Sequence, residues 1–141
     1  MDIKESPEKT AGTGAWESAD VKTILIAEDS NTMRSMLVST IDALERFTIV
    51  EAASGFEALR LLPREQVDLI ITDINMPDIN GLELISYVRN NPNYQLIPLF
   101  IVSTESADKD PEKGLALGAN EYLVKPFDPQ KLQELICKYL D

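Results

Sequence analysis

Short apolar runs alternate along most of the chain with segments whose apolar residues recur at helical spacing. Short runs rich in Ile, Leu, Val and Phe are typical of strands that are buried on both faces. Between the first two runs, residues three or four positions apart predict a helix with one apolar face, formed by Met33, Leu37, Ile41 and Leu44. The predicted strands are residues 23–27, 47–52, 68–72, 98–103 and 121–124.

Capping and breaking residues predict the limits of the second and third helices. Ser54 and Glu57 have the spacing of a capping box, and the helix that they begin should end near Pro63. A further helix is predicted from about residue 81 to residue 90, because Pro92 disfavours helical backbone just before it.

The last two helices differ in expected strength. The fourth is predicted to be weak, since Pro111 falls in its first turn and Gly114 inside it. Asp128 is a favourable N-cap for the fifth helix, and Pro129 suits its first position. The apolar face of this last helix consists of Leu132, Leu135, Ile136 and Tyr139.

This order of elements predicts an α/β fold. Strand–helix units in alternation imply a doubly wound parallel sheet, with right-handed crossovers and helices on both faces. Sheets of this kind bind ligands beyond the carboxyl ends of their strands. The residues that end or follow the strands are therefore the first candidates for a functional role.

Residues 1–22 are expected to form a polar N-terminal tail, and residues 23–141 the domain. The tail holds Ser, Thr, Gly, Pro and charged residues, with Trp16 as its one aromatic side chain. Its start is too polar for a signal peptide, and the apolar runs are too short to cross a bilayer. The single cysteine, Cys137, excludes an internal disulfide, so a cytoplasmic protein is expected.

The net charge narrows the range of partners. It is -11, from 24 acidic and 13 basic residues. Phosphate-rich surfaces repel such a chain, so neither nucleic acid nor an anionic membrane is expected as the main partner. A divalent cation or a basic protein surface suits this balance better.

Ionisable and hydroxyl side chains stand at the ends of four predicted strands. Taken singly, each has an ordinary structural explanation as a helix cap, a turn brace, a strand-end hydroxyl or a solvent-exposed amine. In a parallel sheet, however, these strand ends lie along one edge, so the side chains would converge. They are Glu28 and Asp29 at the first strand, Asp73 at the third, Ser103 and Thr104 at the fourth, and Lys125 at the fifth.

The convergence of three carboxylates indicates a cation. Clustered carboxylates repel one another unless a positive charge joins them, and Mg²⁺ prefers carboxylate oxygens while keeping several waters. With Lys125 as a second positive charge, a phosphoryl group fits as the ligand with oxygens to spare. Asp73 is best placed to carry it, because an aspartate can act as a phosphoryl-accepting nucleophile.

These residues resemble those of response regulator receiver domains of two-component signalling, and most of all the stand-alone, chemotaxis-type (CheY-like) members. The resemblance covers the chain from about residue 23 to its C-terminus. It rests on the pair Glu28-Asp29, on "DSNTMRSML", on "DINMPDINGLEL", on Ser103 and on "EYLVKPF", with matching intervals between them. One departure is Glu28, where Asp is commoner, and the longer side chain alters how this position would hold a metal through water.

The resemblance implies a flavodoxin-like strand order, 2-1-3-4-5, and a role for each residue. Asp73 would be the phosphoacceptor, and Lys125 would contact the phosphoryl group. Mg²⁺, for which Mn²⁺ can substitute, would be bound by Asp29, Asp73 and the backbone carbonyl of Asn75, with Glu28 close by or acting through a water. The switch residues would be Ser103, Thr104 and Tyr122, and the residues that tune the phosphoryl lifetime would be Asn75 and Glu105.

The resemblance also implies partners. A histidine kinase would donate the phosphoryl group, since the chain has no histidine of its own. A downstream protein would bind the face made by the fourth helix, fifth strand and fifth helix, and a phosphatase could be a further partner. The tail and the domain account for all 141 residues, so the expected output is a changed affinity for another protein rather than turnover of an external substrate.

Three other classes of protein fit part of the pattern. A phosphatase of the haloacid dehalogenase type uses an Asp nucleophile, but places it after the first strand with a second Asp two residues later, where this chain has Asn75. A receiver-shaped module that is never phosphorylated usually lacks one of the key residues, all of which are present here. A flavodoxin-like redox protein would share the strand order, but the acidic edge would repel a flavin phosphate.

Overall fold

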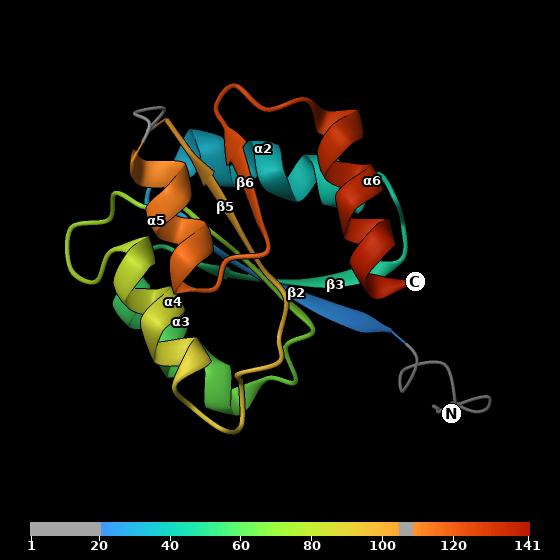
Figure 1. Cartoon of the computed structure of the whole chain (residues 1–141). Helices are drawn as coiled ribbons and strands as arrows, with labels where there is room; N and C mark the ends of the chain where they lie inside the picture. Colours follow the sequence, from blue (N-terminus) through green and yellow to red (C-terminus); the bar gives the residue numbers. More distant parts are fainter. Residues whose placement is uncertain (1–20, 105–108) are drawn as a thin grey trace.

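Parallel strands form a five-stranded sheet in the computed structural model, which describes residues 21–104 and 109–141 (Figure 1). The order across the sheet is β3-β2-β4-β5-β6, which is 2-1-3-4-5 when these strands are counted along the chain, so the predicted fold class is confirmed. The strands are β2 (Lys22–Ala27), β3 (Phe47–Ala52), β4 (Leu69–Thr72), β5 (Leu99–Ser103) and β6 (Glu121–Val124). Two features named above, Trp16 with most of the tail and Glu105, lie outside the described residues.

Helices cover both faces of the sheet, with α2 and α6 on one face and α3, α4 and α5 on the other (Figure 1). Successive residues of a strand point to opposite faces. Ile24 and Ile26 therefore pack in the core under α2 and α6, whereas Leu25 and Ala27 pack under α3 and α4. The helices are α2 (Asn31–Asp42), α3 (Gly55–Leu61), α4 (Gly81–Arg89), α5 (Lys109–Leu117) and α6 (Pro129–Leu140), and the 3₁₀ turn η1 (Leu62–Arg64) follows α3.

The predicted limits of the elements agree with the structure to within two residues, and one of the largest differences is at the end of α2. The prediction that Leu44 continues the apolar face of this helix is wrong, because α2 ends at Asp42. Glu45 has a positive φ of 55°, and the N–H groups of Leu44 and Glu45 donate to carbonyls three residues earlier. A tightened last turn followed by left-handed backbone ends an α-helix.

The residues that cap the helices are not the strand-end acids. Ser30 caps α2, its Oγ accepting the N–H of Met33 at 3.2 Å. Asn80 caps α4 in a reciprocal capping box with Glu83. Glu28 supports the start of α2 only by accepting the N–H of Ser30 at 3.1 Å, and the cap explanation does not account for Asp29 or Asp73.

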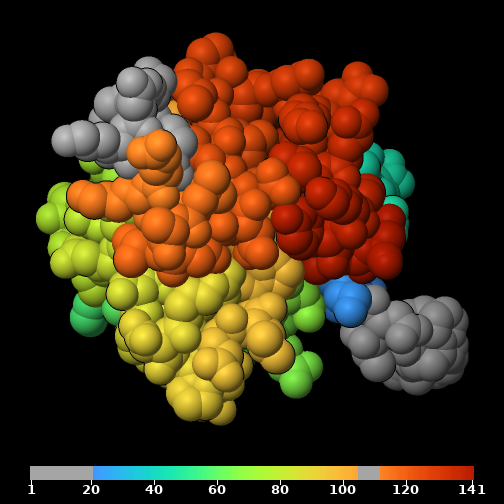
Figure 2. Space-filling view, viewed as in Figure 1, coloured from blue at the N-terminus to red at the C-terminus, as the bar shows by residue number. Residues whose placement is uncertain are grey.

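One face of the molecule combines α5 and α6. Figure 2 shows the surfaces of these two helices on the same side of the molecule. The strand that lies between them in the sequence, β6, is the edge strand of the sheet. Three large apolar side chains are exposed on α5 and β6: Leu115 at 48%, Leu117 at 39% and Val124 at 43%.

Candidate functional site

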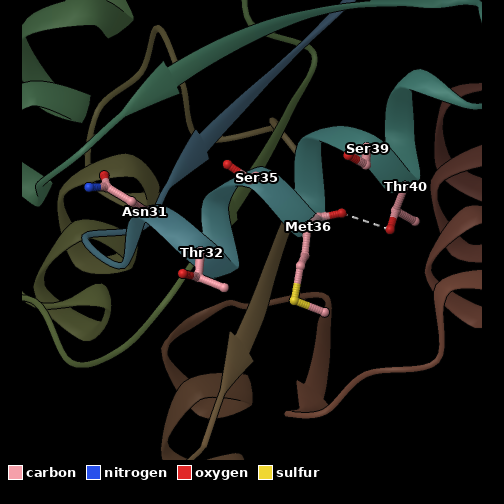
Figure 3. Close-up of a pocket in the computed structure, with 6 residues that line it drawn as sticks. All are labelled: Asn31, Thr32, Ser35, Met36, Ser39 and Thr40. Atoms are coloured by element: carbon pink, nitrogen blue, oxygen red, sulfur yellow. Dashed lines mark hydrogen bonds between the residues drawn. The ribbon is translucent and has the colours of Figure 1, made fainter.

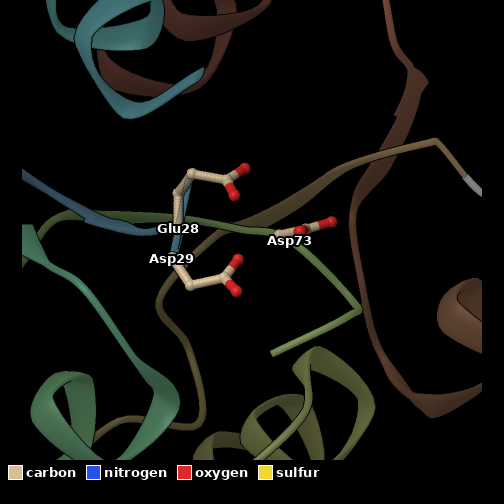
Figure 4. Close-up of side chains that lie close together, drawn as sticks. All are labelled: Glu28, Asp29 and Asp73. Atoms are coloured by element: carbon tan, nitrogen blue, oxygen red, sulfur yellow. The ribbon is translucent and has the colours of Figure 1, made fainter. Parts of the chain in front are cut away.

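Three carboxylates meet at the carboxyl edge of the sheet, from two adjacent strands (Figure 4). Glu28 and Asp29 follow β2, and Asp73 follows β4. One oxygen from each residue lies within 4.8 Å of the others. Glu28 and Asp73 are buried, with 1% and 7% of their surface exposed, whereas Asp29 is exposed to solvent.

Backbone hydrogen bonds extend the strand pairing by one residue and bring the acids to this edge. The N–H of Asp73 donates to the carbonyl of Ala27 at 3.0 Å, and the N–H of Glu28 donates to the carbonyl of Ala52 at 3.0 Å. The Asp73 side chain is also fixed locally, because its Oδ1 accepts the N–H of Ile74 at 2.8 Å. The position of the carboxylates thus follows from the register of the strands.

Lys125 reaches this cluster from just after β6, the edge strand that is separated from β4 by β5. Its Nζ lies 2.8 Å from Glu28 Oε1 and 3.5 Å from Asp73 Oδ2, and only 9% of its side chain is exposed. The backbone N–H of Lys125 donates to the carbonyl of Ser103 at 2.8 Å, and the bond to Pro126 is cis. Lys125 therefore points into the site rather than to solvent.

The charges of the site do not balance. Three carboxylates face one ammonium group, and much of the cluster is buried. Burial raises the pKa of Glu28 above its ordinary value, and the nearby charge of Asp73 acts in the same direction, against hydrogen bonds from Lys125 and the Ser30 N–H. A divalent cation would offset the remaining negative charge, and carboxylate oxygens are ligands that Mg²⁺ prefers.

The loop that follows Asp73 packs tightly on the start of α4. A Cβ at Gly81 would lie 2.2 Å from the carbonyl oxygen of Asp73, so only glycine fits there. The N–H groups of Met76 and Gly81 both donate to the carbonyl of Ile74. Asn75, whose carbonyl is a predicted metal ligand, lies inside this constrained loop with its side chain exposed.

The predicted switch residues occupy the neighbouring strands. Ser103 is fully buried at the end of β5, and Thr104 just beyond it is exposed. Tyr122 on β6 is half-buried, pairs with Ile101 and packs against the core under α3 and α4. Gly114 of α5 lies beside both residues, since a Cβ there would be 2.5 Å from Ile101 Cδ1 and 3.6 Å from Tyr122 Cδ2.

One residue that supports the site was not predicted. Arg34 Nη1 donates to the carbonyl of Glu28 at 2.7 Å, and its Nε donates to Glu51 Oε1 at 3.2 Å. Nη2 donates to Asn31 Oδ1 at 2.6 Å. Arg34 is the only basic residue of α2, but its position in the sequence does not indicate these contacts.

A surface hollow of about 620 Å³ runs along the exposed side of α2, and none of the three carboxylates lines it (Figure 3). The side chains that line it carry no ionisable group, and a hydrogen bond from Thr40 Oγ1 to the carbonyl of Met36 belongs to the helix itself. The hollow therefore offers none of the chemistry of the acidic cluster. Its lining residues are Asn31, Thr32, Ser35, Met36, Ser39 and Thr40.

Comparison with known proteins agrees with this geometry. The response regulator receiver domain family matches residues 24–137. The chain is 42% identical to a chemotaxis protein CheY homolog of Campylobacter jejuni over 112 residues, 79% of this chain and 86% of that protein. It is 38% identical to chemotaxis protein CheY1 of Helicobacter pylori over 112 residues, 79% of this chain and 90% of that protein.

Solved structures lead to the same family. The chemotaxis response regulator CheY4 of Vibrio cholerae superposes with a TM-score of 0.77 at 32% identity, covering 84% of this chain and 98% of that chain. The receiver domain of the sensor histidine kinase PA1611 of Pseudomonas aeruginosa has a TM-score of 0.77 at 25% identity, covers 85% of this chain and 98% of that chain, and holds a magnesium ion in its active site cleft. The chain belongs to the response regulator receiver domain family, and it is a CheY-like signalling protein of the two-component type.

None of the helices in the described part of the chain has the length and apolar character needed to cross a membrane.

Proposed function

We propose that this protein is a signalling switch that accepts a phosphoryl group on Asp73 from a partner histidine kinase, with the help of Mg²⁺. Phosphorylation changes its protein-binding surface, and hydrolysis then restores the resting state. The observation that carries the proposal is the meeting of Glu28, Asp29 and Asp73 with Lys125 at the carboxyl edge of the sheet.

The residues of the site fit a magnesium ion. Asp29, Asp73 and the backbone carbonyl of Asn75 would hold it, and Glu28 would act beside them or through a water. Bound there, the ion would neutralise charge on the transferring phosphoryl group. The magnesium ion in the related PA1611 receiver domain supports this assignment.

The transfer itself is a displacement at phosphorus. An oxygen of Asp73 forms the new O–P bond while the N–P bond of the kinase phosphohistidine breaks, and the electron pair of that bond remains on the imidazole. Lys125, which lies between Glu28 and Asp73 in the resting protein, moves its ammonium group onto a phosphoryl oxygen. Ser103, at the end of the adjacent strand β5, donates its hydroxyl to another.

The switch acts through β6 and α5. Movement of Ser103, together with Thr104, toward the phosphoryl group leaves space into which the ring of Tyr122 turns. Gly114 lets α5 pack closely here, because a Cβ at this position would clash with Ile101 Cδ1 at 2.5 Å, while it would only touch the ring of Tyr122 at 3.6 Å. The downstream protein binds the face of α5, β6 and α6, and a shift of a few kcal/mol is enough to change its occupancy.

The phosphoryl group is removed by water at the same site. Asn75, two residues after the phosphoacceptor, is exposed and can orient that water, and Glu105 has the equivalent place after Ser103. The turnover is that of the protein's own aspartate rather than of an external substrate. A separate phosphatase would shorten the lifetime further.

Metal-dependent labelling tests the proposal. The purified protein is incubated with radiolabelled acetyl phosphate, with Mg²⁺ or with EDTA. Label should appear only with Mg²⁺, and Asp73→Asn should take up none, whereas the control Asp42→Asn, at an exposed acid of α2, should label like the wild type. Equal labelling of wild type and Asp73→Asn would show that the phosphoacceptor is another residue, and steady release of phosphate from general substrates would favour a phosphatase.

A further inference from the structure

The loop between Asp73 and α4 contains a carboxylate that the proposed function does not use. Asp78 lies in this loop and contacts the N-terminus of α3. Its Oδ2 accepts the N–H of Phe56 at 2.9 Å, and its Oδ1 accepts the N–H of Gly55 at 3.3 Å. The N–H of Ile79 lowers the pKa of Asp78 most, and the N–H groups of Phe56 and Gly55 act in the same direction, so hydrogen bonding favours the ionised carboxylate.

Asp78 completes the capping of α3. The first N–H groups of a helix have no partner within the helix. Ser54 satisfies one of them, since its Oγ accepts the N–H of Glu57 at 3.0 Å; its carbonyl accepts the N–H of Ala58 at 3.1 Å, which is the first bond within the helix itself. The two N–H groups of the first turn that Ser54 does not reach are those bound by Asp78.

The backbone of the loop also rests on α3. A Cβ at Gly55 would lie 2.1 Å from the carbonyl oxygen of Ile79 and 2.9 Å from its Cβ. Two consecutive loop residues, Asp78 and Ile79, are therefore in direct contact with the first residue of this helix. Only glycine at position 55 permits so close an approach.

The other end of the loop is fixed at the phosphoacceptor. The N–H of Ile74 donates to Asp73 Oδ1, and the carbonyl of Ile74 accepts the N–H groups of Met76 and Gly81. Asn75 lies between this anchor and the one at Asp78.

We propose that Asp78 is a positioning residue for the metal site: by fastening the loop to α3 it aims the Asn75 carbonyl and thereby sets the affinity for Mg²⁺. This inference rests on the proposed function, because it takes the Asn75 carbonyl to be a ligand. Asp78 acts through the loop and does not touch the metal or the phosphoryl group. Groups that orient metal ligands in this way change metal affinity when they are removed.

Two variants separate loop positioning from helix capping. Asp78→Ala removes both acceptors and frees the loop, while Ser54→Ala removes the other side-chain cap of the same helix without touching the loop. The dissociation constant of Mg²⁺ is measured by calorimetry on the full chain, and stability by urea unfolding. Asp78→Ala should raise the dissociation constant about tenfold, and Ser54→Ala should leave it within about twofold at a similar loss of stability.

The charge of Asp78 needs its own control. Loss of a negative charge near the site would also weaken cation binding, but that effect is screened by salt, so the titrations are repeated at high ionic strength. Asp78→Asn keeps one acceptor oxygen, so it should raise the dissociation constant of Mg²⁺ less than Asp78→Ala does, and this increase should persist at high ionic strength. The same variant replaces Asp78→Ala in the test if that protein does not fold.

Each outcome is decisive. If Asp78→Ala has the same dissociation constant for Mg²⁺ as Ser54→Ala, Asp78 acts only as a helix cap. If the effect of Asp78→Ala vanishes at high ionic strength, Asp78 acts only through its charge. Either result contradicts the inference. If the wild type itself binds no Mg²⁺, the proposed function fails at its metal site, whatever the variants do.

Discussion

Replacing Lys125 by methionine removes the ammonium group from the site and keeps the aliphatic stem. In the resting protein Lys125 Nζ lies 2.8 Å from Glu28 Oε1 and 3.5 Å from Asp73 Oδ2. The side chains of Glu28 and Lys125 are only 1% and 9% exposed, so water has little access to solvate the Glu28 carboxylate once the ammonium group is gone. Lys125→Met therefore leaves Glu28 buried without its nearest charged partner and leaves the carboxylates to repel one another.

The size of the effect follows from this burial. Removing one partner of a buried ion pair costs about 3–5 kcal/mol. The lower end applies, because the pKa of Glu28 is already raised, chiefly by burial, and proton uptake limits the cost. The free energy of unfolding of Lys125→Met should therefore be about 3 kcal/mol below that of the wild type near pH 8. The loss should be smaller at lower pH, because each pH unit nearer the pKa of Glu28 makes its protonation easier by about 1.4 kcal/mol.

Urea unfolding followed by circular dichroism, in EDTA and in excess Mg²⁺, measures this loss. Mg²⁺ should restore most of the stability of Lys125→Met, because it supplies the missing positive charge. Lys138→Met is the control, since Lys138 Nζ is 4.0 Å from Glu121 Oε2 and its side chain is 67% exposed. The control should change by less than about 0.5 kcal/mol. Equal losses in the two variants, or a loss in Lys125→Met that Mg²⁺ leaves unchanged, would refute the electrostatic account of the site.

Three further variants test how the site is built. Because the pKa of Glu28 is raised above its ordinary 4.5, the wild type loses stability as the pH rises from that ordinary value to the raised pKa; in EDTA, Glu28→Gln should therefore gain stability over the wild type across this range, and a constant difference in urea unfolding would contradict this. Gly81→Ala places a Cβ 2.2 Å from the backbone carbonyl oxygen of Asp73, so it should lower the free energy of unfolding by about 1–3 kcal/mol and weaken Mg²⁺ binding. Gly114→Ala, whose nearest neighbour is the Ile101 side-chain methyl, should bind Mg²⁺ like the wild type in calorimetry. Arg34→Gln should raise the Mg²⁺ dissociation constant, while Arg60→Gln, at a side chain 46% exposed, should not; identical titrations would remove Arg34 from the support of the site.

Local patterns were sufficient to predict most of the fold. The strands are short apolar runs, fully buried in β4 and β5, and four of the five helices begin at residues with a clear capping or starting signal, such as Ser54 and Asp128. The end of α2 could not be predicted, because it depends on Glu45 adopting left-handed backbone, and a glutamate carries no such signal. Leu44 was consequently assigned to a helix that ends before it.

The site was predictable as far as it follows from topology. Acids at the ends of adjacent parallel strands must lie close together, whatever their side chains do. The directions of the side chains could not be predicted in the same way. The sequence allowed Lys125 to extend into solvent, whereas in the structure only 9% of its side chain is exposed. Arg34 and Asp78 were missed because their partners, Glu51 and the N-terminus of α3, lie on other elements of the chain. No local spacing encodes such contacts.

The central claim is that Asp73 itself carries the phosphoryl group. The protein is phosphorylated with acetyl phosphate and Mg²⁺, reduced with borohydride, which converts an aspartyl phosphate to homoserine, and digested for mass spectrometry. Homoserine should appear at position 73, and should be absent when EDTA replaces Mg²⁺. Homoserine at another acidic residue, or an unmodified peptide around Asp73 in protein that holds phosphate, would contradict the account.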